Sequence, residues 1–402
     1  MKNLSSFQVW SIFSFFAVLS ISILTIGLPY RGDERHFVET IKLFSDNFNL
    51  NTLKDYPEVT PPLFYYVFAA WSKLFGFSIE SLRIFNSIIS FFTWLLIFKL
   101  NEKFIADKKI QFLISLISVL NPYFLGMSAH VFTDMLTINF ILISMLSFFN
   151  NNFIYFTIFS TMAILTRQYA IIFPAGVLIY SVLNIKNLST TNKKFIFAAI
   201  VSLIPILILF AVWQNISPKS GIEKWFIQNS NTYNLDYINS YLTFSIIYIL
   251  PIFVLISRKI KLNIKVLLTS VVLSVLISLF PIKTSVATLT LTDYKTIGFA
   301  HEFLVETFGF ETIITKFLLW SFLLIGCVIN LNIILSIIEM IKKKVYEKDL
   351  VLYLVWVLFL SVMPFSYQVW EKYITMIIPF YLLSIYIFIY KPDLAKKSVI
   401  KV

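Results

Sequence analysis

The sequence from Tyr30 to Pro62, YRGDERHFVETIKLFSDNFNLNTLKDYPEVTPP, is a polar segment enclosed by two apolar stretches. The stretch before it, residues 7–28, is an apolar run of the length that a helix needs to cross hydrocarbon. The stretch after it, residues 61–77, is apolar and aromatic but offers only about fifteen helical residues, so its length alone leaves open whether it spans the bilayer. Asp33 and Glu34 therefore lie where a bilayer would end. Ionisable groups at such a site are costly to desolvate, so two carboxylates there suggest a function.

The composition defines the class of protein. Of the 402 residues, 58% are hydrophobic and 13% are charged, which excludes an ordinary soluble protein. Uninterrupted apolar runs predict an all-α, polytopic membrane protein, because a transmembrane barrel alternates apolar and polar residues. The run at 7–28 is too long for the core of a signal peptide, so we expect a retained helix. Cys327 is the single cysteine, which excludes an intramolecular disulfide and a cysteine-based metal site.

A pass along the chain predicts about twelve transmembrane helices in one membrane domain, 1–402, with no soluble domain. Within it we expect a catalytic module at 8–185, with an external loop at 29–82, and a variable module at 195–390. The expected spans are 8–28, 83–101, 110–127, 135–149, 153–166, 169–185, 195–213, 237–256, 266–282, 313–338, 350–364 and 373–390.

The distribution of charge orients these spans. If residues 61–77 lie in the interface, the inner segments hold 20 Lys and Arg against 6 Asp and Glu, and the outer segments 13 against 15. The positive-inside rule favours this arrangement. We therefore expect both termini in the cytoplasm, the loop at 29–82 outside, and a multi-pass protein of the plasma (inner) membrane. The net charge of +12 is explained by this asymmetry, so no nucleic-acid partner is expected.

The polar segment contains a second interfacial element. In Glu34–Asp46, Phe37, Ile41 and Phe44 recur at helical spacing with charged residues between them. This pattern predicts an amphipathic helix suited to lying on the bilayer. The first external loop should thus hold two juxtamembrane helices joined by residues 47–60.

Ionisable side chains gather on the predicted outer side. They come from the ends of noncontiguous spans, an arrangement that suits a reaction between a lipid-borne anion and a polar substrate. Structural roles are possible for each: Lys372 and Trp370 as interface anchors, Arg167 as a snorkelling helix end, and Asp134 as a helix N-cap. The candidates beyond Asp33 and Glu34 are His36, His130, His301, Asp134, Arg167, Gln168, Glu371 and Lys372.

The order of these pieces resembles a known family. An acidic pair after the first span is followed by Pro61-Pro62-Leu63-Phe64-Tyr65-Tyr66, by Leu74-Phe75-Gly76, and by Leu82-Arg83 at the next span. This looks like the GT-C superfamily of membrane glycosyltransferases, particularly the family 39 type with protein O-mannosyltransferases and bacterial aminoarabinose transferases.

Two later pieces, Thr133-Asp134 and the stretch from Arg167 to Ile172, RQYAII, resemble the dolichyl-phosphate-glucose α-1,2-glucosyltransferase of the endoplasmic reticulum. The resemblance is specific over residues 8–175 and architectural beyond them.

The resemblance implies a polyprenyl-phosphate-linked sugar as donor and an acceptor hydroxyl or amine on a glycan, lipid or protein. It implies inverting transfer on the extracytoplasmic face of the bilayer, with Asp33 at the family's catalytic position. A positioned carboxylate can take the acceptor's proton, and Glu34 and Asp134 are the other catalytic candidates.

The leaving phosphate needs cationic donors, for which Arg167 and Lys372 are the candidates, with Arg83 behind them. No obligatory metal is expected, although the three carboxylates are of the type that binds Mg²⁺ or Mn²⁺. The remaining candidates for substrate or phosphate binding are His36, His130, Gln168, Tyr65 and Glu371.

Two other classes remain open. A flippase or transporter of lipid-linked sugars would share the size and basic inner face, but should carry charges near mid-bilayer and often an internal repeat. A noncatalytic membrane scaffold gives no reason for two interfacial helices beside an acidic pair.

Overall fold

The computed structural model describes residues 4–184, 190–225, 233–256, 263–291, 294–344 and 346–390. All regular structure in these ranges is helical, which confirms the expected all-α fold. The chain divides into two compact units, residues 1–228 and 229–402, and each is described by itself.

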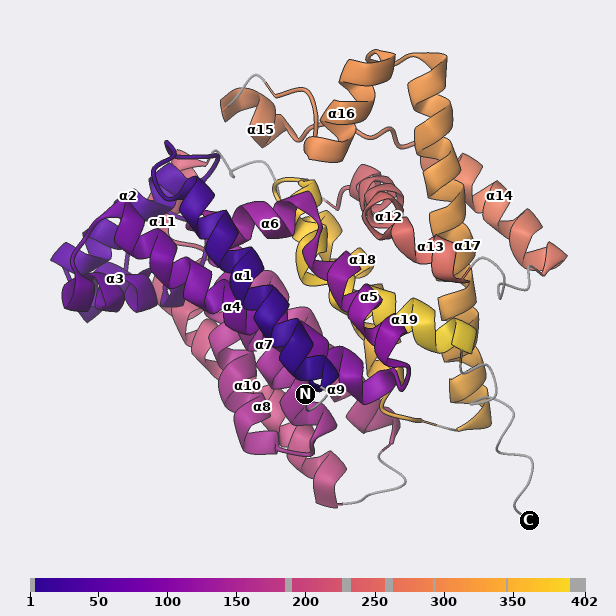
Figure 1. The fold of residues 1–402 in the computed structure, drawn as a ribbon, viewed down its shortest axis with the longest axis horizontal. Helices are drawn as coiled ribbons and strands as arrows, with labels where there is room; N and C mark the ends of the chain where they lie inside the picture. The colour runs from indigo at the N-terminus through magenta and orange to yellow at the C-terminus, as the bar shows by residue number, and fades with distance from the viewer. Residues whose placement is uncertain are drawn as a thin grey trace. The chain divides into compact units, whose positions relative to one another are not determined.

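The first unit (Figure 1) begins with a long helix and ends with a short one. Its α-helices are α1 (Ser6–Thr25), α2 (Glu34–Asp46), α3 (Leu63–Phe75), α4 (Ile79–Phe104), α5 (Lys108–Val119), α6 (Pro122–Ala129), α7 (Thr133–Phe149), α8 (Phe153–Ile164), α9 (Ile172–Leu183), α10 (Thr190–Trp213) and α11 (Lys219–Lys224). Two 3₁₀ turns, η1 (Leu50–Leu53) and η2 (Gln168–Ile171), lie between them.

Helix α7 forms the centre of the first unit. It packs against α4 and α8, α4 packs against α1, and α10 packs against α8 and α9. Nearly all of α7 is buried, including polar residues such as Thr137, whose hydroxyl bonds Thr166 on the neighbouring turn at 2.9 Å. The first unit thus has a helical core, and two of its helices, α1 and α4, hold the ends of the loop between them.

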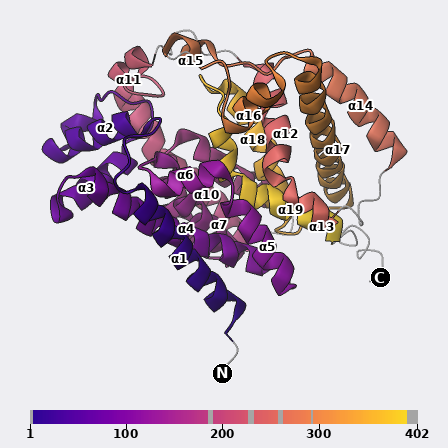
Figure 2. The ribbon, with the colours of Figure 1, turned by 45° about the horizontal axis from the view of Figure 1, so that its top comes forward.

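The loop between α1 and α4 contains the two short helices expected there. Helix α2 begins and ends at the predicted residues, and α3 occupies most of the predicted 61–77 segment. The two lie side by side, as Figure 2 shows. At 13 residues, α3 is about 20 Å long, shorter than the roughly 30 Å of a hydrocarbon core.

The apolar face of α2 has a different neighbour from the one that the sequence suggested. Phe37, Ile41 and Phe44 are buried within the protein rather than left for a bilayer. The ring of Phe44 stacks on that of Tyr65 of α3, with centroids 5.5 Å apart. An amphipathic stripe records only that one face is apolar, and here helix α3 covers that face.

Short polar sequences end and restart the helices. Ser5 and Gln8 form a capping box at the start of α1. Asn121 caps α6, with Pro122 at its first position, and this pair bends the chain by 68° between α5 and α6. The predicted span 110–127 is therefore two helices joined at a break.

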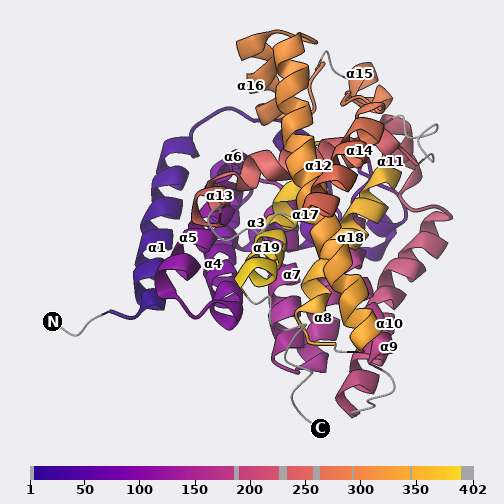
Figure 3. The same ribbon diagram turned by 90° about the vertical axis from the view of Figure 1, so that its right-hand side faces the viewer.

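The second unit contains the remaining helices, shown in Figure 3. They are α12 (Leu235–Ile249), α13 (Pro251–Ile256), α14 (Ile264–Ser278), α15 (Val286–Leu291), α16 (Phe299–Phe308), α17 (Ile313–Lys343), α18 (Leu350–Val362) and α19 (Ile378–Tyr390), with the 3₁₀ turns η5 (Met363–Phe365) and η6 (Glu371–Met376).

Close packing of α12 on α17 organises the second unit. A Cβ placed on Gly326 of α17 would lie 2.9 Å from the carbonyl oxygen of Leu242 on α12, so glycine permits this approach. Helix α14 packs against the same side-by-side pair. The rings of Trp356 on α18 and Tyr381 on α19 stack with centroids 3.7 Å apart.

Among the described residues, four helices are long and apolar enough to cross a bilayer: α1, α4, α10 and α17. The bent pair α5 and α6 adds a fifth if it is one span. Every predicted span coincides with a helix or a pair of consecutive helices, but several of these are short. The count of about twelve spans stays a prediction.

Candidate functional site

Glu34, the second residue of the acidic pair, forms a buried ion pair with Arg83 of α4. Arg83 Nε lies 2.9 Å from Glu34 Oε1, and Nη2 lies 2.6 Å from Oε2, the two-pronged geometry of a strong arginine–carboxylate pair. Glu34 is fully buried and Arg83 is 2% exposed. Gly32, with a φ of +52°, makes the turn just before Glu34.

Arg83 also closes the end of α1. Its Nη1 donates to the carbonyl oxygens of Thr25, Ile26 and Leu28 at 2.7–3.0 Å. The last carbonyl groups of a helix have no partner within the helix, so a buried cation here satisfies them and suits the negative end of the helix dipole. The sequence assigned Arg83 to phosphate binding, whereas its contacts in the structure fasten α1 to α2.

The segment between α6 and α7 completes the surroundings of Glu34. The amide of Val131 donates to Glu34 Oε1 at 2.9 Å, and His130 Nδ1 lies 3.2 Å from Oε2. Burial by itself would raise the pKa of the Glu34 carboxyl, but the hydrogen bonds from Arg83, His130 and the amide outweigh it and lower the pKa to about 2. Glu34 is therefore a structural carboxylate that is charged at neutral pH.

Asp134 and Arg167 form a second buried pair. Arg167 Nη2 lies 2.9 Å from Asp134 Oδ2, Nε donates to the hydroxyl of Thr133 at 2.6 Å, and the hydroxyl of Tyr169 donates to Asp134 Oδ1 at 2.8 Å. Helix α7 begins at Thr133, and its N-cap residue is Phe132. Asp134 therefore lies in the first turn of α7 and is not the N-cap. The carboxylate and the arginine that the sequence singled out are thus brought together.

Asp33 and His36 belong to a third cluster, which is partly open. His36 Nε2 lies 3.5 Å from Asp33 Oδ1, and Nδ1 lies 2.9 Å from Glu58 Oε1. Lys224 on α11 reaches the same Glu58 oxygen at 3.0 Å. The Asp33 side chain is 36% exposed, in contrast to those of Glu58 and the two paired carboxylates.

Two other candidates in the first unit contact structural groups. Gln168 Nε2 donates to the carbonyl oxygen of Val59 at 2.7 Å, which fastens η2 to the segment before α3. The buried hydroxyl of Tyr65 bonds that of Thr60 at 2.7 Å. Their contacts indicate that both residues shape the loop, and a role in substrate binding stays a prediction.

Glu371 and Lys372 lie in the second unit. The Glu371 carboxylate accepts the amides of Ala300 and His301 at 2.9 and 2.7 Å and bonds the hydroxyl of Tyr248. Those amides open α16, whose N-cap is Gly298 and has no side chain, so Glu371 takes the place of a capping residue. Lys372 Nζ lies 5.9 Å from the ring centre of Trp370, within cation–π range.

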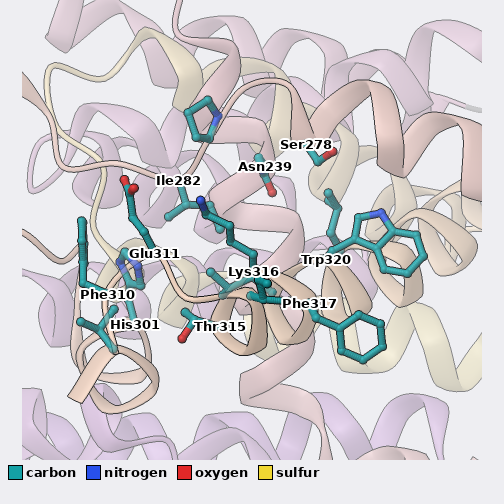
Figure 4. A pocket seen from close by; sticks show the side chains of 15 residues that line it. Asn239, Ser278, Ile282, His301, Phe310, Glu311, Thr315, Lys316, Phe317 and Trp320 are labelled. Atoms are coloured by element: carbon teal, nitrogen blue, oxygen red, sulfur yellow. The ribbon is translucent and has the colours of Figure 1, made fainter. Parts of the chain in front are cut away.

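A cavity of about 550 Å³ opens in the second unit between α14, α16 and α17. Figure 4 shows Asn239, Glu311 and Lys316 around it together with the rings of Phe317 and Trp320. None of the predicted catalytic carboxylates lines this cavity.

No metal-ligating group of three or more His, Cys, Asp or Glu side chains occurs in the ranges that the structure describes. In the third cluster, Asp33 and Glu58 approach opposite ring nitrogens of His36, so they do not converge on one point. Binding of Mg²⁺ or Mn²⁺ stays a prediction from the carboxylates alone.

Four residues of these clusters were not among the predicted site residues, although two of them, Thr133 and Tyr169, lie within the motif pieces quoted above. Tyr169 and Thr133 directly adjoin singled-out residues, and Glu58 stands three residues before Pro61 in the quoted polar segment, so proximity to a motif was an available signal. Lys224 lies 166 residues after Glu58, and no local pattern marks it.

Comparison with known proteins places the first unit in a family context. Residues 59–213 match the family model of dolichyl-phosphate-mannose-protein mannosyltransferases. This match covers α3 to α10 and includes Arg83, Asp134 and Arg167. It confirms the resemblance to GT-C membrane glycosyltransferases that the sequence predicted.

Two crystal structures of ArnT from Cupriavidus metallidurans are similar to the chain. The one bound to undecaprenyl phosphate shares 12% sequence identity, with a TM-score of 0.46 over 96% of this chain and 78% of that chain. The apo structure shares 13% identity, with a TM-score of 0.45 over 97% and 79%. No curated protein matches the sequence.

Proposed function

We propose that the chain is a membrane glycosyltransferase, because residues 59–213 match the family model of dolichyl-phosphate-mannose-protein mannosyltransferases. It moves a sugar from a polyprenyl-phosphate-linked donor to an acceptor hydroxyl or amine on the extracytoplasmic face. Asp33 acts as the general base.

The observation that carries this proposal is that the three candidate carboxylates differ in burial and in pairing with arginine. Glu34 and Asp134 are each locked to an arginine in a buried pair. Asp33, the N-cap residue of α2, has a side chain that is 36% exposed. Since a base must reach the acceptor's proton, this accessibility supports Asp33 as the general base.

The chemistry follows from that placement. Asp33 takes the proton of the acceptor hydroxyl as the acceptor oxygen bonds the anomeric carbon of the sugar. The bond from that carbon to the phosphate oxygen breaks, and the polyprenyl phosphate leaves as an anion. Attack opposite the leaving group inverts the anomeric centre.

Arg167 is our candidate for holding the phosphate. Thr133 and Asp134 fix two of its nitrogens, so the guanidinium is held in one orientation before any ligand arrives. A preorganised cation stabilises developing charge without reorganisation at the moment of reaction. A phosphate bound here would share the cation with Asp134.

The test uses purified protein in detergent with dolichyl- and undecaprenyl-phosphate-linked mannose, glucose and aminoarabinose, and identifies products by mass spectrometry. We expect product with at least one donor, and we expect Asp33→Asn to lower turnover by about 10²–10⁴, the usual contribution of a positioned base. Asp46→Asn, at the exposed end of the same helix, is the matched control.

Wild-type turnover by Asp33→Asn would remove Asp33 from the mechanism. A different result would favour transport: no product from any donor, together with passage of the sugar lipid across the bilayer of proteoliposomes.

A further inference from the structure

The imidazole of His36 lies between two carboxylates from different parts of the chain. Nδ1 is hydrogen-bonded to Glu58 Oε1 at 2.9 Å, whereas Nε2 lies 3.5 Å from Asp33 Oδ1, an ion-pair distance without hydrogen-bond geometry. Asp33 opens α2, whereas Glu58 belongs to the segment that leads into α3. His36 thus connects the accessible carboxylate to a buried one.

Glu58 is firmly held where it meets the imidazole. Its side chain is 2% exposed, and Lys224 Nζ lies 3.0 Å from the oxygen that contacts His36. A Cβ placed on Gly221 of α11 would lie 2.4 Å from the carbonyl oxygen of Glu58, so α11 rests directly on this backbone. The buried carboxylate therefore has little freedom to move.

The plane of the imidazole is also fixed. The ring of Trp225 meets it in a T-shaped contact with centroids 4.7 Å apart, and Phe37 meets it at 4.5 Å. With the ring plane fixed and Nδ1 committed to Glu58, the direction of Nε2 is determined. That direction leads to Asp33.

The charge on His36 depends on the groups that face it. Burial lowers the pKa of the imidazole, but Asp33 and Glu58 together outweigh burial and raise it. Lys224, from α11, opposes this through its shared contact with Glu58. A raised pKa extends to higher pH the range over which both ring nitrogens carry a proton and the imidazolium attracts the Asp33 carboxylate.

We propose that Glu58 and His36 are positioning residues for the catalytic carboxylate: Glu58 fixes the imidazole, and the charged imidazole attracts the Asp33 carboxylate and so orients it to take the acceptor's proton. His36 keeps its own protons throughout the transfer, and the acceptor's proton ends on Asp33. This inference rests on the proposed function, because it takes Asp33 as the base.

The first test does not depend on transfer. The chain contains only three histidines, so histidine labelled with ¹³C and ¹⁵N gives few signals to assign by NMR in detergent micelles. We expect His36 to titrate above the ordinary histidine value. Glu58→Gln and Asp33→Asn should each lower its pKa, and Lys224→Met should raise it further.

Lys224→Met should raise the His36 pKa, opposite to the change expected for Glu58→Gln. The inference can therefore still be tested with Lys224→Met if Glu58→Gln fails to fold. The signals of His130 and His301 report folding in every variant. A His36 pKa below the ordinary value in wild type, or one that moves in none of the variants, would overturn the inference.

The second test measures transfer once a donor is identified from the panel above. We expect Glu58→Gln to lower kcat by about 10- to 100-fold with little change in the donor's KM, because small misplacement of a catalytic group is costly. As pH rises through the His36 pKa, Nε2 loses its proton and activity falls. Glu58→Gln should move that fall to lower pH.

Glu39→Gln is the matched control, since Glu39 lies exposed on the same helix and pairs with Arg35. An unchanged pH profile in Glu58→Gln would overturn the positioning role. Retention of activity by Asp33→Asn, with the histidine shifts as expected, would instead refute the proposed base and leave the coupling of the three side chains intact.

Discussion

Replacing Arg83 with Met should destabilise the first unit more than it disturbs any binding step. The change leaves the carboxylate of Glu34 buried without its main partner and removes donors from the three carbonyl groups at the end of α1. Breaking one side of a buried ion pair typically costs about 3–5 kcal/mol. By the scaling for domains of this size, the midpoint of thermal unfolding should fall by about 6–20 °C.

The assay is thermal unfolding in detergent, followed by tryptophan fluorescence. Arg35→Met is the control, because Arg35 forms an exposed pair with Glu39 and such pairs contribute less than about 1 kcal/mol. Combining Arg83→Met with Glu34→Gln removes both charges and should recover part of the loss. A variant Arg83→Met that unfolds with wild-type Tm but no longer binds the donor would show that Arg83 is a phosphate ligand instead.

The lowered pKa of Glu34 gives the same pair a pH signature. A carboxyl whose pKa is about 2 when folded and about 4.5 otherwise stabilises the folded state above pH 4.5. That stabilisation, about 3 kcal/mol at 1.36 kcal/mol per pKa unit, is lost as the pH falls toward 2. Unfolding midpoints measured between pH 7 and 3 should therefore decline less steeply in Glu34→Gln than in wild type, and equal slopes would contradict this assignment.

Three further changes test other parts of the molecule. Arg167→Ala should weaken donor binding and turnover together, with Lys only partly restoring both because it lacks the bidentate fork; unchanged kinetics would leave Arg167 a structural partner. Gly221→Ala should lower the unfolding midpoint, because its Cβ would meet the Glu58 carbonyl oxygen, and an unaffected midpoint would show that α11 can move aside. In cells, a cysteine at Lys219 should react with an impermeant thiol reagent and one at Ala106 should not, with the buried Cys327 giving little background; labelling at Ala106 would reverse the predicted orientation.

Local patterns predicted a helix well where its apolar residues recurred at helical spacing along its whole length. Helix α2 has the predicted bounds because its apolar positions recur at helical spacing between a turn glycine and a polar linker. The break between α5 and α6 was missed, since an apolar run predicts burial but not direction. Asn121-Pro122 was the available signal, because an Asn cap followed by Pro typically starts a new helix.

The partners of the site residues were beyond sequence reasoning. Arg83 was a phosphate-binding candidate behind Arg167 and Lys372, and the sequence did not predict its pairing with Glu34, 49 residues earlier. Charge in a sequence shows that a partner is needed and does not identify it. The same holds for Lys224, which sequence spacing cannot relate to Glu58 because the two meet only through the packing of α11.

The acidic pair itself shows how neighbouring residues acquire different roles. Successive side chains at the start of a helix point about 100° apart, so Asp33 and Glu34 cannot both face the core. Glu34 turns inward to Arg83 and His130, and Asp33, the N-cap of α2, remains at the surface beside His36. The pairing of Glu34 with Arg83 fixes the start of α2. The start of α2 in turn fixes the backbone position of Asp33, its N-cap residue. A substitution at Glu34 should therefore impair catalysis through stability and the placement of Asp33, whereas Asp33→Asn should impair catalysis with the fold intact.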